Sequence, residues 1–231
     1  MSIAENIALV RANIAQACAQ AGRSPEEITL VGASKMNDAA ACREAIAAGI
    51  DALGENRVQE MTAKLAENAY DGAPLHFIGH LQRNKVKQVV GKVALIQSVG
   101  SLELLEEIEK VAAARELVQD ILLEVNIGRE EAKSGFDPAE VAAAAETALA
   151  RPHVRVRGLM TIPPADADRD TNMRYFQEVQ ALYVDINTKL FHNELKCLSM
   201  GMSGDYMDAI RCGATMVRVG TAIFGARHYN I

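Results

Sequence analysis

Residues 28–35 read Ile28-Thr29-Leu30-Val31-Gly32-Ala33-Ser34-Lys35. A run this apolar is typical of a parallel strand that is covered on both faces, and here it closes on a single amine. Burial penalises a charged lysine and favours the neutral, nucleophilic form, which is the form that makes a Schiff base with a carbonyl compound. Taken alone, a strand-end lysine that reaches solvent is the more ordinary interpretation. The segments further along the chain reverse that preference.

Strand-like and helix-like segments alternate along the whole chain. A lead-in helix is predicted over 2–20, where apolar residues follow one helical stripe. Strands are predicted at 28–35, 51–55, 75–79, 93–98, 119–127, 154–162, 196–200 and 215–219. Helices are predicted at 38–48, 57–69, 82–90, 102–116, 138–150, 170–191 and 204–211. This alternation implies parallel pairing with right-handed crossovers. Eight units within residues 1–231 predict an α/β protein, a single-domain (β/α)₈ TIM barrel with an extra N-terminal helix.

Residues that start and stop helices support these boundaries. Gly49 and Gly213 follow predicted helices, where a glycine can adopt the left-handed conformation that ends a helix. Asp38 and Asp137 stand directly before predicted helices as N-caps, and Pro138 would occupy the first helical position of the second one.

The overall composition excludes several classes of partner. The chain has no Trp and only 4% aromatic residues, so it lacks the stacking surface of a single-stranded nucleic-acid binder. The net charge of −6 and the pI near 5.4 argue against binding to a phosphate backbone. Any phosphate ligand must therefore be held by local geometry.

The cysteines and the N-terminus indicate a cytoplasmic protein. Cys18, Cys42, Cys197 and Cys212 are widely spaced and suit free buried thiols better than disulfides or zinc ligands. Residues 1–5 show no signal peptide. No apolar run approaches the roughly 20 residues that would span a bilayer, so no membrane association is expected.

Three strand ends carry the residues that predict a ligand. In barrel enzymes the reacting groups lie at the C-terminal ends of strands, and phosphate often binds after strands 7 and 8. Lys35 ends the first strand, residues 198–203 end the seventh, and residues 218–222 end the eighth. Glycines there let backbone N–H groups approach an anion, and hydroxyls come from Ser199, Ser203 and Thr221. An amine beside a phosphate cup predicts pyridoxal 5′-phosphate (PLP), although either glycine segment alone could be a tight turn.

The same segments resemble the pyridoxal phosphate homeostasis protein family, which comprises single-domain relatives of bacterial alanine racemase (PLP fold type III). The resemblance covers nearly the whole chain. It runs through Val31-Gly32-Ala33-Ser34-Lys35, Gly54-Glu55-Asn56-Arg57-Val58-Gln59-Glu60, His76-Phe77-Ile78-Gly79-His80-Leu81-Gln82-Arg83-Asn84-Lys85, Leu198-Ser199-Met200-Gly201-Met202-Ser203 and Val217-Arg218-Val219-Gly220-Thr221-Ala222-Ile223-Phe224-Gly225.

The resemblance implies a role for each matching residue. Lys35 would form the Schiff base with PLP, Asn56 would lie near the cofactor ring, and Arg218 would face the pyridine nitrogen. The implied phosphate contacts are Ser199, Gly220 and Thr221, with Met200, Gly201 and Ser203 lining the same turn. No catalytic residue and no metal ligand is implied.

Arg218 and the C-terminus together favour binding over turnover. A guanidinium stays protonated, so it can only donate to the pyridine nitrogen and leaves PLP a weak electron sink. Alanine racemases resembling this chain carry a second domain that supplies a tyrosine base, whereas this sequence ends at Ile231. The expectation is therefore a monomeric, non-enzymatic PLP protein for intracellular homeostasis, which buffers the cofactor or delivers it. Its partners would be PLP-dependent apoenzymes or PLP-synthesising enzymes.

Two alternatives remain open from the sequence. One is a low-activity PLP-dependent amino-acid racemase that uses Lys35 and one further base. The other is a barrel without PLP that binds a different phosphorylated metabolite in the same cup.

Several other residues have two interpretations each. His76 and His80 could ligate a metal only with distant carboxylates, so no metal site is predicted. The basic residues of segment 83–92 are expected on one helix, either as a solvated face or as a docking surface. Lys133 would either lie near the cofactor's phenolic oxygen or be an ordinary loop lysine. Tyr206 covers the phosphate or packs its helix. The basic residues are Arg83, Lys85, Lys87 and Lys92.

Overall fold

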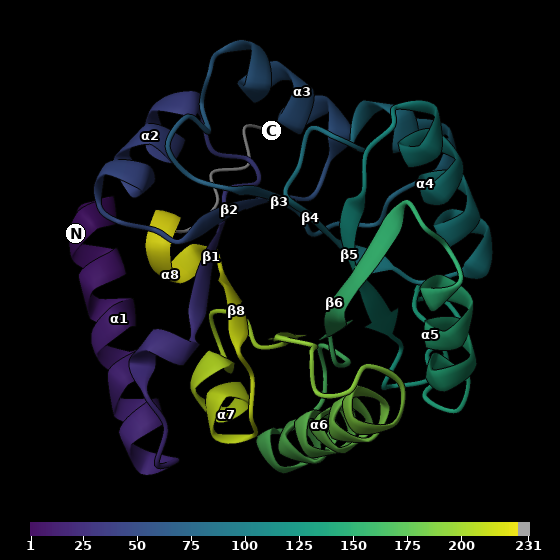
Figure 1. Ribbon diagram of the computed structural model, residues 1–231. Coiled ribbons are helices and arrows are strands. Elements are labelled where there is room, and N and C mark those ends of the chain that lie inside the picture. Colours follow the sequence, from purple (N-terminus) through teal and green to yellow (C-terminus); the bar gives the residue numbers. More distant parts are fainter. Residues whose placement is uncertain (226–231) are drawn as a thin grey trace.

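The computed structural model describes residues 1–225, and within them eight parallel strands close into a barrel in chain order (Figure 1). Closure is made by β1, which pairs with both β2 and β8. The strands are β1 (Thr29–Ala33), β2 (Ala52–Glu55), β3 (Leu75–Phe77), β4 (Leu95–Val99), β5 (Gln119–Val125), β6 (Val154–Thr161), β7 (Cys197–Ser199) and β8 (Met216–Val219). Every predicted strand is confirmed, with boundaries that differ by no more than two residues.

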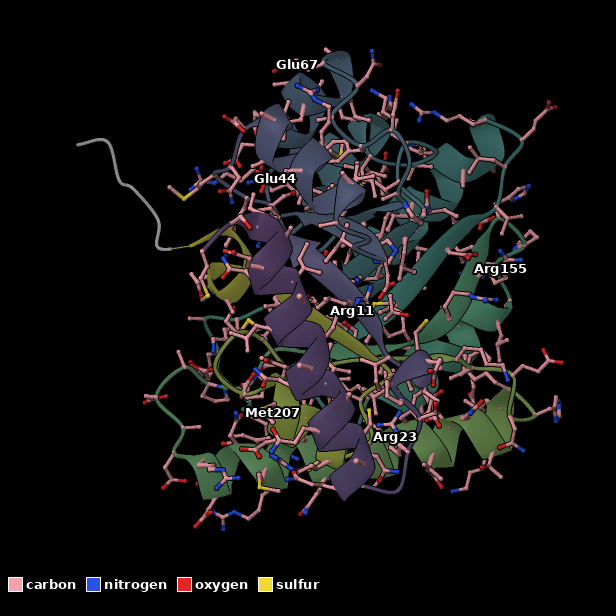
Figure 2. The ribbon with its side chains drawn as sticks, turned by 90° about the vertical axis from the view of Figure 1, so that its left-hand side faces the viewer. Arg11, Arg23, Glu44, Glu67, Arg155 and Met207 are labelled. Atoms are coloured by element: carbon pink, nitrogen blue, oxygen red, sulfur yellow. The ribbon has the colours of Figure 1, made fainter. Side chains whose placement is uncertain are left out.

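Helices form the outer ring of the barrel (Figure 1). The helices are α1 (Ile3–Gln20), α2 (Ala39–Ala47), α3 (Val58–Ala66), α4 (Leu102–Ala114), α5 (Val141–Leu149), α6 (Arg169–Leu190), α7 (Tyr206–Arg211) and α8 (Thr221–Phe224). The N-terminal helix α1 is confirmed, and it begins with a capping box between Ser2 and Glu5. Figure 2 shows α1 along the outside of the barrel, where Arg23 donates to the carbonyls of Ile210 and Ala214.

The predicted helix 82–90 is wrong in type. Residues Arg83–Gln88 form a 3-10 helix, η2, and Val86 is its one buried side chain. The buried residues of segment 82–90 are Val86, Val89 and Val90, and β-branched residues have a low helix propensity. Lys92 lies beyond η2, so the basic residues of this segment do not share one helix.

The predicted start of the helix at Pro138 is also wrong. The Asp137 carboxylate accepts the Ala139 N–H at 2.9 Å, and the Asp137 carbonyl accepts the Glu140 N–H at 2.8 Å. These bonds close a separate turn, because an aspartate side chain can bond to its own backbone two residues on. Helix α5 therefore begins only at Val141. The sequence analysis also missed two short helices, η1 (Pro25–Glu27) and α8.

The other helix signals are confirmed. The Asp38 carboxylate accepts the Ala41 N–H at 2.8 Å and caps α2. Gly49 and Gly213 follow α2 and α7 with φ angles of 81° and 98°, which is the left-handed region where glycine is favoured.

Two apolar layers fill the fold. The larger lies between the strands and the helices, and the smaller fills the inside of the barrel. The interior layer consists of Val31, Ala52, Leu95, Leu122, Met160 and Met216. Because this layer blocks the barrel, a ligand can reach the polar groups above it only from the C-terminal mouth.

Among residues 1–225, no helix is long and apolar enough to cross a membrane. The four cysteines are free thiols, and Cys18, Cys42 and Cys212 are buried. The segment after Gly225, including Ile231 on which the argument about a second domain rests, lies outside the described residues.

Candidate functional site

Lys35 lies at the mouth of the barrel, two residues beyond the end of β1, in a turn where it is partly buried. The register pairs Gly32 with Val219 and Ala33 with Gly54. The turn of Lys35 therefore lies between the end of β8, where Gly220 follows, and the end of β2, where Asn56 follows. Closure of the barrel thus brings together three of the predicted site residues.

The loops after β7 and β8 are joined by one hydroxyl. Ser203 Oγ accepts the backbone N–H groups of Gly220 and Ala222 at 3.2 and 3.3 Å. Thr221 is exposed as the first residue of α8. The predicted phosphate cup would lie between these two loops, which bring backbone N–H groups and hydroxyls together in the type of arrangement that binds phosphate.

Gly201 and Met200 fix the wall of this cup. Gly201 has a φ of 94°, and a Cβ there would lie 2.6 Å from the Cβ of Ala209 in α7. Met200 is fully buried and donates its N–H to the carbonyl of Met216. Tyr206 is a packing residue, because it is buried and its hydroxyl accepts from Asn13 of α1 at 3.0 Å.

Arg218 extends from β8 into the barrel interior and is 3% exposed. Its Nη1 donates to Ser199 Oγ at 2.5 Å, and its Nη2 donates to the Thr161 carbonyl at 2.9 Å. Burial lowers the pKa of Arg218 to about 10, while the charges of Glu124 and Asp205 oppose that shift. The guanidinium is therefore cationic at neutral pH.

A chain of hydrogen bonds continues from Arg218 across the barrel. Ser199 Oγ donates to Gln97 Oε1 at 2.7 Å, and Gln97 Nε2 lies 3.0 Å from His76 Nδ1. Burial lowers the pKa of His76 to about 4, so the ring is neutral and accepts the amide proton. The hydroxyl of Ser199 is thus engaged in the barrel interior with Arg218 and Gln97. Gln97 was missed by the sequence analysis, although a single glutamine in an apolar strand is a signal for it.

A cavity of about 400 Å³ opens at the mouth above β2, β3, β5 and β6. Asn56 lines it, and its Oδ1 is buried without a hydrogen-bond partner among residues 1–225. Glu124 lines it too; burial raises the pKa of this carboxyl, which accepts from Ser134 at 3.0 Å. The sequence analysis missed Glu124, which interrupts an apolar strand as Gln97 does.

Lys133 and His80, two residues that the sequence analysis weighed, border the same mouth. Lys133 lines the cavity and forms an ion pair with Glu130. His80 lines it as an exposed residue. Within residues 1–225, no three metal-ligating side chains cluster together.

These residues fit PLP. The buried amide oxygen of Asn56 lacks a hydrogen-bond partner in the part of the chain that the structure describes, which is costly unless a ligand supplies one. The cup offers donors for a phosphate, Lys35 offers an amine for an aldehyde, and Arg218 offers a fixed cation. Together these groups match an aromatic aldehyde that bears a phosphate.

The fold is that of the barrel domain of alanine racemases. The family model "Alanine racemase, N-terminal domain" matches residues 6–228. An alanine racemase structure from Clostridium difficile 630 superposes with a TM-score of 0.72 at 19% identity, which shows the shared fold; the match covers 98% of this chain and 58% of the racemase.

Relatives with higher sequence identity identify the family within this class of barrel proteins. A pyridoxal phosphate homeostasis protein from Aquifex aeolicus is 42% identical over 99% of this chain and 100% of its own length. The one from Escherichia coli K12 is 38% identical over 99% and 98%. PipY of Synechococcus elongatus, whose structure holds PLP, has a TM-score of 0.84 at 33% identity over 97% of this chain and 100% of its own. The chain belongs to the pyridoxal phosphate homeostasis protein family.

The buried neutral His76 predicts a pH dependence of stability. Its folded pKa of about 4 lies below the value of 6.5 that applies when unfolded. The unfolded chain therefore binds more protons, and stability falls as the pH drops from 6.5 towards 4. Between pH 7 and pH 5 the loss due to His76 should be about 2 kcal/mol. Urea unfolding of wild type and His76→Gln at both pH values measures it, and equal losses in the two proteins would contradict the assignment.

Proposed function

We propose that this protein holds PLP reversibly as a Schiff base on Lys35, and that it buffers or delivers the cofactor with little or no turnover. The observation that carries the proposal is the position of Lys35 in a turn beside the cup that Ser203 closes. Membership of a family that binds PLP, and the PLP-containing structure of PipY, support it. The recipients would be PLP-dependent apoenzymes, and PLP-synthesising enzymes would supply the cofactor.

The bond that holds the cofactor is reversible. The neutral amine of Lys35 adds to the aldehyde carbon and one water leaves, which gives a C=N bond; addition of water reverses the step. We assign the phosphate to the cup, where Ser203 and Thr221 offer hydroxyl donors and Met200 and Gly201 shape the wall. Gly220 would line the cup, with its N–H bonded to Ser203. Ser199 was predicted as a further phosphate contact, but its hydroxyl is bonded to Arg218 and Gln97. Asn56 would contact the ring.

Ser199 and Arg218 would act at the nitrogen of the PLP pyridine ring. Arg218 donates to the pyridine nitrogen, and Ser199 acts through Arg218, since its hydroxyl accepts from the guanidinium. Because the guanidinium stays cationic, it keeps its own proton and the pyridine nitrogen stays unprotonated. The ring then withdraws electrons weakly, and chemistry at the α-carbon of a bound amino acid is slow. This favours a carrier. The alternative is a low-activity racemase, for which Glu124 at the cavity offers an acid–base group.

Reduction with borohydride tests the proposed attachment. Protein mixed with one equivalent of PLP should show a visible absorption band, and borohydride should fix a pyridoxyl group on Lys35 by reducing the C=N bond. Peptide mapping identifies the residue. A Lys133→Met variant, which removes another amine at the same mouth, should keep the label on Lys35. A label mainly elsewhere, or no band at all, would overturn the proposal.

The phosphate cup is tested through Thr221. Thr221→Ala removes a hydroxyl donor to a charged acceptor, which is worth about 1.5–3 kcal/mol. The dissociation constant for PLP should therefore rise by about one to two decades. Pyridoxal, which lacks the phosphate, should bind both proteins almost equally. Equal losses for the two ligands would place the phosphate outside the cup.

Proton exchange separates the carrier from the racemase. PLP-loaded protein incubated with L-alanine in heavy water should incorporate little deuterium at Cα and form almost no D-alanine, measured by mass spectrometry and chiral chromatography. Rapid exchange that Glu124→Gln abolishes would instead establish the racemase alternative, with Glu124 as the base.

A further inference from the structure

A network of buried charges lies behind Lys35, between β1, β2 and α3. Glu55 at the end of β2 is fully buried, and Lys64 of α3 is 6% exposed. Lys64 Nζ lies 2.6 Å from Glu55 Oε1. The same oxygen accepts the Tyr70 hydroxyl at 3.0 Å, and burial and the adjacent Glu55 charge raise the pKa of that phenol, which keeps it a donor.

The network fixes every polar group of Ser34, the residue before Lys35. Ser34 Oγ donates to Glu55 Oε1 at 2.6 Å, the Ser34 carbonyl accepts from Lys64 Nζ at 2.8 Å, and its N–H donates to the Gly54 carbonyl at 3.0 Å. The Ser34 side chain thus faces outward to α3. The residue before Lys35 is therefore held in place, and with it the point at which the turn of Lys35 begins.

A second carboxylate holds the residue after Lys35. Met36 has a φ of 64°, which is unusual for a residue other than glycine and costs energy unless its surroundings impose it. Its N–H donates to Glu60 Oε2 at 2.8 Å. Glu60 and Lys64 stand four residues apart on α3, so one face of this helix holds the turn on both sides of Lys35.

We infer that Glu55, Glu60 and Lys64 are positioning residues for Lys35. They hold the Ser34–Met36 turn in the conformation from which the Lys35 amine reaches an aldehyde bound in the cup. Buried ion pairs contribute little net stability, so conformational specificity is the function that this pair would serve. The inference rests on the proposed function of Lys35 and adds to it the source of its orientation.

The test compares two ligands that differ only at the reacting carbon. PLP carries an aldehyde, whereas pyridoxine 5′-phosphate carries an alcohol and cannot form a Schiff base. Glu60→Ala removes the acceptor of the Met36 N–H and should weaken PLP binding about tenfold, the scale of one hydrogen bond to a charged group. Binding of pyridoxine 5′-phosphate should stay unchanged. Glu60→Gln, which keeps a side-chain oxygen, should restore most of the PLP affinity.

Two controls complete the design. Glu67→Ala removes a carboxylate from the exposed end of the same helix, labelled in Figure 2, and should affect neither ligand. The double variant Glu55→Gln/Lys64→Met removes both charges of the buried pair together. Like Glu60→Ala, it should raise the dissociation constant for PLP relative to that for pyridoxine 5′-phosphate. Circular dichroism confirms that each variant is folded.

The possible outcomes distinguish a failure of this inference from a failure of the proposed function, which is attachment of PLP to Lys35. An unchanged ratio of the two dissociation constants in Glu60→Ala, whether both ligands weaken or neither does, would overturn the inference while wild type still reacts with PLP. Failure of wild type to form the Schiff base would overturn the proposed function itself.

Discussion

Arg218 is buried inside the barrel, and a guanidinium in that position must be compensated by partners because an uncompensated ion costs several kcal/mol to bury. Those partners come from the ends of three other strands. β7 supplies the Ser199 hydroxyl, β6 supplies the Thr161 carbonyl, and the Glu124 carboxyl of β5 lowers the electrostatic cost. The upper part of the barrel interior is polar for this reason, while the layer below it is apolar.

A second polar network lies on the opposite side of the barrel wall. Glu55 and Lys64 face outward, between β2 and α3, and hold Ser34. The end of β1 therefore lies between an inner network built around Arg218 and an outer one built around Glu55. The same strand contributes its apolar residues to both hydrophobic layers. A rigid strand end is what a site needs if it binds a small aldehyde without catalytic machinery to reorient it.

Much of the architecture could be predicted from the sequence because apolar runs of strand length alternate with segments of helical period. The errors fall where that pattern is weak. The apolar residues of segment 82–90 are all valines, which favour an α-helix only weakly, and Asp137 forms a local turn in place of a cap. In the site, Lys35 and the two glycine loops carried a signal in combination, although each alone had an ordinary structural interpretation. Lys64 carried none, since a lysine on a helix is ordinarily a surface residue, and only packing against Glu55 buries it.

The sequence by itself determined the order and extent of the strands, the helix N-cap at Asp38, the glycines of the two loops and the family. These features depend on local periodicity, local backbone conformation and residue identity. Only the tertiary structure decided that Ser199 faces inward to Arg218, that Ser203 joins two loops, and that α3 holds the turn of Lys35. These contacts join residues 17 to 24 positions apart, and they arise only when β7 lies beside β8 and α3 packs behind the end of β1.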